Sequence, residues 1–159
     1  MRVRKDSSGF TIIEILVVLV IIGILLTLVI STYSGVQAKN RNKDRQSGIS
    51  LLQGQLEMYY AQYSKYPTLA EMNSANWRAS NMKSLPSSGI QDPQWSVKTT
   101  NCTSGDVAVL SASPTAGCYS YQPVGPDGSA CDNEKVVCGQ YTATAMLEGG
   151  GKYVKSSLN

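Results

Sequence analysis

Residues 10–30 read FTIIEILVVLVIIGILLTLVI, an apolar run in which Glu14 is the only charged residue. A helix that spans a bilayer needs about 20 apolar residues, whereas a run of about 10–14 suits a buried helix of a soluble domain. The run is also longer than the roughly 7–15-residue core of a cleaved secretory signal. It therefore predicts a membrane-spanning helix, and this helix constrains how the rest of the chain can fold.

The sequence on either side of this run has a different composition in each part. Residues 1–9 (MRVRKDSSG) are short, basic and polar. Residues 31–66 contain no proline, whereas all six prolines and all four cysteines follow residue 66. We therefore divide the chain into an N-terminal segment (1–9), a transmembrane helix (10–30), an amphipathic continuation of that helix (31–66) and a globular head (67–159).

The overall composition excludes several classes of function. The chain has no histidine, which excludes Ser-His-Asp hydrolysis, Cys-His nucleophiles and histidine-bearing metal sites. Its net charge of +3 is too small for the basic footprint of a nucleic-acid-binding domain. Only 16% of its residues are charged, against roughly 25% in soluble domains. We therefore expect a structural or binding protein, with no enzymatic activity and no specific nucleic-acid partner.

The helix is predicted to continue well beyond the apolar run. Hydrophobic residues recur at steps of three and four, which is typical of an amphipathic helix. They are Ile49, Leu52, Leu56, Tyr59 or Tyr60, and Tyr63. Pro67 disfavours helical geometry in the residue before it, so the helix should end near Tyr66. We expect one helix from Thr11 to Ser64, with this stripe facing the head.

The head is predicted to be a small antiparallel sheet. Residues 69–83 suit a short helix and a loop, and the two tryptophans, Trp77 and Trp95, suit packing within the head. Short connections between successive strands favour antiparallel pairing. The expected strands are 107–111, 119–124, 140–147 and 152–156. The fold class is therefore α+β, a long N-terminal helix packed on an antiparallel sheet.

The four cysteines allow three pairings. No C-x-x-C spacing is present, so a metal site on these cysteines is weakly supported. Neighbours in a meander are the easiest to bring together, which favours Cys102–Cys118 and Cys131–Cys138. Disulfides form outside the cytoplasm. Because the basic charges flanking residues 10–30 do not decide the orientation, the cysteines place the N-terminus inside and the C-terminus outside.

The junction SGFTIIE at residues 8–14 resembles that of the type IV pilin and pseudopilin family. A short basic segment ends in Gly9, Phe10 opens the apolar helix, and Glu14 follows four residues later. The sequence YSKYP at residues 63–67 is similar to the tyrosine-rich end of the helix in such proteins. The resemblance implies a pilin fold. It also implies that residues 1–9 are a leader peptide, that a prepilin peptidase cleaves between Gly9 and Phe10, and that Phe10 is then N-methylated.

The resemblance also implies a function. We expect a structural subunit of a type IV pilus or related filament, with an adhesion or motility pilus favoured. The alternatives are the major pseudopilin of a type II secretion-like system, a DNA-uptake pilus, and a monomeric signal-anchored binding module. The implied partners are copies of the chain itself, the prepilin peptidase and an inner-membrane assembly platform. The chain would be a single-pass membrane protein before assembly and a cell-surface filament afterwards.

Three charged groups have both a functional and a structural interpretation. Thr11 and Glu14 fit a capping box, whereas the resemblance implies that Glu14 and Phe10 act in subunit assembly. Asp127, Asp132 and Glu134 could hold calcium, as the resemblance to pseudopilins implies, but their spacing fits no calcium-loop motif and favours solvated carboxylates. The basic residues from Lys39 to Arg45 could contact phosphate, but we expect a solvated helix face. We therefore expect no cofactor.

Overall fold

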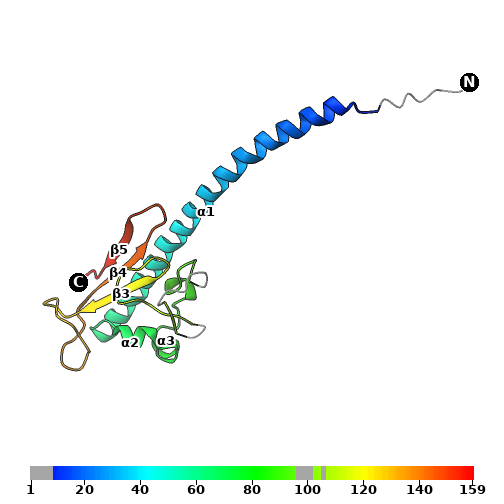
Figure 1. Cartoon of the computed structure of the whole chain (residues 1–159). Helices are drawn as coiled ribbons and strands as arrows, with labels where there is room; N and C mark the ends of the chain where they lie inside the picture. The colour runs from blue at the N-terminus through cyan, green and yellow to red at the C-terminus, as the bar shows by residue number, and fades with distance from the viewer. Residues whose placement is uncertain (1–8, 96–101, 105–106) are drawn as a thin grey trace, which may run out of the picture. The chain divides into compact units, whose positions relative to one another are not determined.

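The computed structural model describes residues 9–95, 102–104 and 107–159, without the side chains of residues 29–34 and 103–108. The chain divides into two compact units, Met1–Gln37 and Ala38–Asn159. Helix α1 (Ile12–Tyr63) runs through both (Figure 1). Its bounds lie within one residue of the predicted helix at each end.

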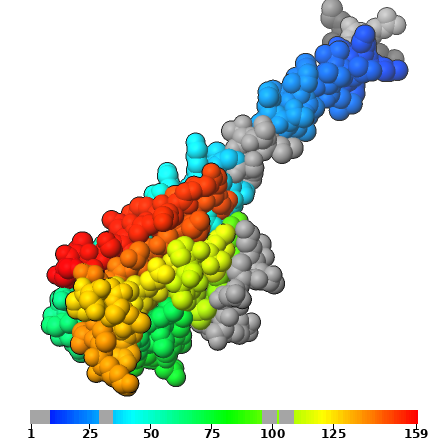
Figure 2. Space-filling model, turned by 60° about the vertical axis from the view of Figure 1, so that its left-hand side comes forward, coloured from blue at the N-terminus to red at the C-terminus, as the bar shows by residue number. Residues whose placement is uncertain are grey.

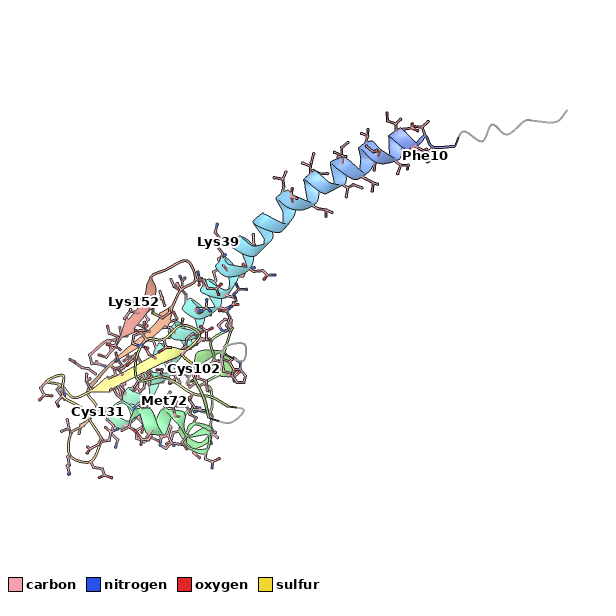
Figure 3. The ribbon with its side chains drawn as sticks, viewed as in Figure 1. Phe10, Lys39, Met72, Cys102, Cys131 and Lys152 are labelled. Atoms are coloured by element: carbon pink, nitrogen blue, oxygen red, sulfur yellow. A yellow bond between two sulfur atoms is a disulfide. The ribbon has the colours of Figure 1, made fainter. Side chains whose placement is uncertain are left out.

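The part of α1 in the first unit carries, as far as Leu28, a surface that is apolar apart from Glu14 and Thr27. Its large apolar side chains from Phe10 to Leu28 are between 45% and 89% exposed. They project from both sides of the helix, with Phe10 just before its first turn (Figure 3). Among the residues that the structure describes, no helical stretch is both long and apolar enough to cross a bilayer. The predicted membrane span ends with residues 29 and 30, whose side chains are not among those that the structure describes.

The part of α1 in the second unit forms one wall of the head's core. Ile49, Leu52 and Leu56 are fully buried, and Tyr59 is nearly so. Tyr63 departs from the prediction, because it is 44% exposed and its ring lies on the outside, 4.5 Å from that of Tyr59. The reason is the end of α1, where Ser64 adopts a φ of 54° and reverses the chain. Tyr66, which follows this reversal, is fully buried.

Three short helical turns follow. They are α2 (Leu69–Asn73), α3 (Ala75–Asn81) and the 3-10 helix η1 (Ser87–Gly89). Thr68 caps α2, since its side chain accepts from the Glu71 N–H while Glu71 accepts from the Thr68 N–H. Trp77 on α3 packs against the core, with its ring 5.4 Å from that of Tyr59.

The predicted antiparallel sheet is confirmed. Strands β3 (Tyr119–Val124), β4 (Gln140–Met146) and β5 (Lys152–Ser156) pair in the order β3-β4-β5. In Figure 2 they lie side by side along one face of the head, coloured yellow to red. The expected strand 107–111 is shorter, because β2 (Val107–Ala108) pairs only with β1 (Thr103–Ser104). Ser111 instead bridges to Ser120 of β3.

The core lies between this sheet and α1. Ala143 and Ala145 of β4 are fully buried, as is Tyr121 of β3. These residues form one cluster with Ile49, Leu52, Leu56 and Tyr59. The side of the helix predicted to be apolar is therefore the side that the sheet covers.

Candidate assembly site and head junction

The residues of the predicted processing and assembly site lie at the start of α1. Gly9 and Phe10 precede the helix and are exposed. Glu14 Oε2 accepts from the Thr11 N–H at 2.8 Å and from the Thr11 hydroxyl at 2.7 Å. The Glu14 N–H donates in return to Thr11 Oγ1 at 3.3 Å. The capping box is therefore formed, and the peptide bond between Gly9 and Phe10 lies outside it.

Both hydrogen bonds from Thr11 end on the same oxygen of Glu14. Among the described residues, the other oxygen, Oε1, makes no hydrogen bond. Glu14 is also exposed on the helix surface. Capping thus uses one oxygen of the carboxylate, and the other can accept a hydrogen bond from a second molecule.

A charged junction joins α1 to the head. It corrects the prediction of a solvated basic face at Arg41 and Arg45, whereas Lys39 and Lys43 are exposed as predicted. Arg45 is 1% exposed and pairs with Asp92 Oδ2 at 2.6 Å and with Glu148 Oε1 at 2.8 Å. Arg41 pairs with the other oxygen of Glu148, also at 2.6 Å. Arg41 and Arg45 lie eight and four residues before Ile49, so they continue the buried stripe toward the N-terminus. That spacing was the sequence signal for their position.

Asn42 completes the junction with backbone contacts to the β4–β5 turn. Its amide nitrogen donates to the Glu148 carbonyl at 3.0 Å, and its Oδ1 accepts from the Glu148 N–H at 2.9 Å. The guanidinium groups of Arg41 and Arg45 lower the pKa of Glu148 to about 2, with the hydrogen bond from Arg41 the largest cause. The carboxylate is therefore ionised at neutral pH.

A second polar cluster, which the sequence did not indicate, holds the C-terminus against the end of α1. Glu57 accepts from the hydroxyls of Tyr66 and Tyr141, each at 2.9 Å. The Asn159 amide donates to the Tyr66 hydroxyl at 3.2 Å. Burial is the main cause that raises the pKa of Tyr66 to about 12, so it remains a neutral donor. Glu57 directly follows the buried Leu56, and this position in the sequence does not indicate that Glu57 accepts hydrogen bonds from the two tyrosines.

Two disulfides stabilise the head, Cys102–Cys118 and Cys131–Cys138. These are the two pairs favoured from the sequence. Cys102 and Cys131 are labelled in Figure 3. The second disulfide closes a loop between β3 and β4.

The acidic residues of this loop bond to their own backbone. Asp132 Oδ1 accepts from three successive N–H groups, those of residues 134–136. Asp127 Oδ1 accepts from the Ser129 N–H at 3.0 Å. The hydrogen bonds from the Ser129 side chain and then from its N–H lower the pKa of Asp127. Those from the three N–H groups, that of Lys135 first, lower the pKa of Asp132. Across the described ranges, no three His, Cys, Asp or Glu side chains are grouped so as to hold a metal ion, and Asp127, Asp132 and Glu134 form no such group.

The comparisons with known proteins match the N-terminal part of the chain to one family model. The model for the prokaryotic N-terminal methylation motif matches residues 4–30. The chain therefore carries the N-terminal motif of the type IV pilin and pseudopilin family. This confirms the resemblance seen at residues 8–14, and the α+β architecture agrees with the pilin fold.

Among curated proteins, the chain is similar to type II secretion system core protein G. The protein from Dickeya chrysanthemi is 43% identical over 65 residues, which cover 41% of this chain and 42% of the relative. The Aeromonas hydrophila protein is 38% identical over 65 residues, covering 41% and 46%. The protein from Escherichia coli strain K12 is 40% identical over 68 residues, covering 43% and 47%. The chain spans less than half the length of these curated relatives, and no solved structure matches it.

Proposed function

We propose that this chain is a pseudopilin, a structural subunit of a filament in a type II secretion-like system. The observation that carries the proposal is the methylation motif at residues 4–30, together with relatives named as secretion core protein G. These relatives favour the secretion alternative over the adhesion or motility pilus that the sequence analysis preferred. The proposed role is structural, without catalysis or a cofactor.

The proposed sequence of events begins with a membrane-anchored precursor. Residues 10–30 anchor the chain with its N-terminus inside and its head outside the cytoplasm. A prepilin peptidase cleaves after Gly9 and methylates the amine of Phe10. A membrane assembly platform then adds the subunit to a homopolymer, in which the exposed apolar surface of α1 becomes covered by copies of itself. The two disulfides and the exposed side chains of α1 support this order.

Glu14 and Phe10 are the proposed contact between subunits. Cleavage leaves a new amine on Phe10, and Glu14 has one carboxylate oxygen not used by its own cap. The ammonium group of one subunit can then pair with the Glu14 carboxylate of its neighbour. A buried ion pair is costly to break when one partner is removed, which makes it suited to fix the register between subunits.

Two variants separate this contact from helix capping. Glu14→Gln can still cap, because a capping box accepts either Glu or Gln, but it loses the charge. Thr11→Ala removes the cap and keeps the charge. We expect Glu14→Gln to be inserted and cleaved normally but to form few or no filaments, whereas Thr11→Ala forms them. The measurement is the amount of sheared filament seen by electron microscopy, with immunoblots for the cleaved subunit.

The outcomes also distinguish the alternative functions. Normal filaments from Glu14→Gln, or equal losses in both variants, would restrict Glu14 to capping its own helix. Intact mass of the assembled subunit should show a methylated chain that begins at Phe10. An uncleaved chain without filaments would favour the monomeric binding module. A deletion strain that secretes normally but loses surface attachment or DNA uptake would replace the secretion role with the corresponding pilus.

A further inference from the structure

A hollow of about 450 Å³ lies in the head, between α1, η1 and β3. Ligand pockets in proteins commonly have volumes of about 300–1,000 Å³, so it is large enough to hold a small molecule. It is separate from the assembly site, because its described lining begins at Asp44 and belongs to the second unit. The proposed filament function does not use it.

A buried tyrosine, Tyr119, is among the described residues that line this hollow. Tyr119 is 1% exposed, and its hydroxyl makes no hydrogen bond to another described residue. A tyrosine hydroxyl can both donate and accept a hydrogen bond. It is therefore available to a ligand.

Gly48 brings α1 close to this hydroxyl. A Cβ atom at position 48 would lie 2.6 Å from the Tyr119 hydroxyl and would collide with the Ser88 carbonyl. Glycine therefore allows the helix backbone to form one wall of the hollow at this depth. At this point the wall is helix backbone, which loses no side-chain freedom when a ligand binds.

The charges around the hollow disfavour anionic ligands. Asp92 is compensated, since Arg45 pairs with it at 2.6 Å. Asp44 is exposed and makes no salt bridge within the described residues. No lysine or arginine is among the described lining residues. A phosphate, a nucleic acid or an acidic peptide would therefore meet a carboxylate without a compensating cation.

The remaining lining combines one aromatic ring with several neutral polar groups. Trp95 supplies a flat apolar surface, and Ser47, Ser88 and Gln91 supply hydroxyl and amide groups. A sugar ring has the matching chemistry, with an apolar C–H face that stacks on an aromatic ring and hydroxyls at its edge that bond to such groups. We infer that this hollow binds a neutral saccharide, with Trp95 under the ring and Tyr119, Gln91 and Asp44 bonding its hydroxyls.

The test is calorimetric titration of the full chain in micelles of a detergent without a sugar headgroup. The probes are chitotetraose and maltotetraose at millimolar concentration, with putrescine and inorganic phosphate as charged alternatives. We expect at least one of the two saccharides to bind and neither charged probe to do so. Binding of putrescine or phosphate alone, or of none of the four probes, would overturn the proposal.

Three variants locate the binding. Tyr119→Phe removes a hydroxyl that has no described partner, so it should keep the melting temperature and weaken saccharide binding about 2- to 10-fold, the effect of one hydrogen bond. Asp44→Asn should act similarly, and Trp95→Ala should weaken binding by about 10-fold or more. Tyr60→Phe, a partly buried tyrosine outside the described lining, is the matched control. Equal affinity in the wild type and in Tyr119→Phe and Asp44→Asn would overturn the assignment, even if Trp95→Ala fails to fold.

Discussion

Arg45 is buried in the head, where its guanidinium group forms salt bridges with both Asp92 and Glu148. Burying a charge is unfavourable unless partners compensate it, and here two carboxylates from distant parts of the chain do so. Asp92 follows η1, whereas Glu148 lies in the β4–β5 turn. One side chain of α1 therefore connects two otherwise separate loops of the head.

Replacement of Arg45 should strongly destabilise the head. Arg45→Met keeps most of the side chain's volume but leaves Asp92 buried without its partner, which costs about 3–5 kcal/mol. The measurement is the free energy of unfolding of the full chain by urea, followed by near-ultraviolet circular dichroism. Arg41→Met is the matched control, because the Arg41 and Glu148 side chains are 28% and 26% exposed. It should cost about 1 kcal/mol or less. Equal losses in the two variants would contradict a special role for Arg45.

Glu148 should make the stability of the head depend on acidic pH. Its pKa is about 2 in the folded chain against an ordinary value of 4.5. A carboxyl whose pKa is lowered by folding contributes stability above its unfolded pKa and loses it as the pH falls. We therefore expect the free energy of unfolding to fall between about pH 5 and pH 2. Urea titrations at several pH values should show a shallower decline for Glu148→Gln, and parallel curves would refute the assignment.

Two glycines of α1 should respond to alanine in opposite directions. A methyl group added at Gly54 would meet nothing within 4 Å beyond the backbone of its own helix, so Gly54→Ala should stabilise by about 0.5–1 kcal/mol through helix propensity. At Gly48 the same change forces a methyl group into the Ser88 carbonyl. Gly48→Ala should therefore destabilise by about 1–3 kcal/mol. Thermal melts of the two variants test this, and a gain in stability at both positions would show that α1 does not lie so close to η1.

The elements of this chain could be predicted where one local pattern determines them. The apolar run and Pro67 bound α1, and the short connections between successive strands indicated the antiparallel pairing of β3, β4 and β5. Tyr63 could not be placed correctly, because its exposure depends on the positive φ of Ser64. β1 was missed, because two residues that pair only with β2 leave no periodic signal.

The sites were predictable only in part, for a related physical reason. Gly9, Phe10 and Glu14 form a contiguous motif, which sequence alone can show. The burial of Arg45 depends on Asp92 and Glu148, which are 47 and 103 residues away along the chain. The spacing of four residues from Arg45 to Ile49 was the one sequence signal that indicated burial of Arg45. The many charged residues next to Arg45 indicated exposure to solvent instead. The role of Glu57 likewise depends on distant residues, since Tyr141 and Asn159 are 84 and 102 residues away along the chain.

The head as a whole should depend on both disulfides. They close loops of 16 and 7 residues, and restricting the unfolded chain in this way stabilises a domain by about 2–4 kcal/mol per disulfide. Replacing both cysteines of a pair by serine should therefore lower the free energy of unfolding, and more so for Cys102 and Cys118, which close the longer loop. Non-reducing peptide mapping of the wild type should find no free thiol. Four reduced thiols in the native protein would contradict an oxidising location.

The charged junction, which includes the ion pair between Arg41 and Glu148, affects when the head can form. These residues are 107 positions apart, and contacts between distant residues form slowly because a long stretch of chain must be closed first. Synthesis proceeds from the N-terminus, so Arg41 and Arg45 leave the ribosome long before Glu148 is made. The junction can close only after nearly the whole chain has been translated. Ribosome stalling before residue 148 would therefore leave α1 without its anchor to the β4–β5 turn.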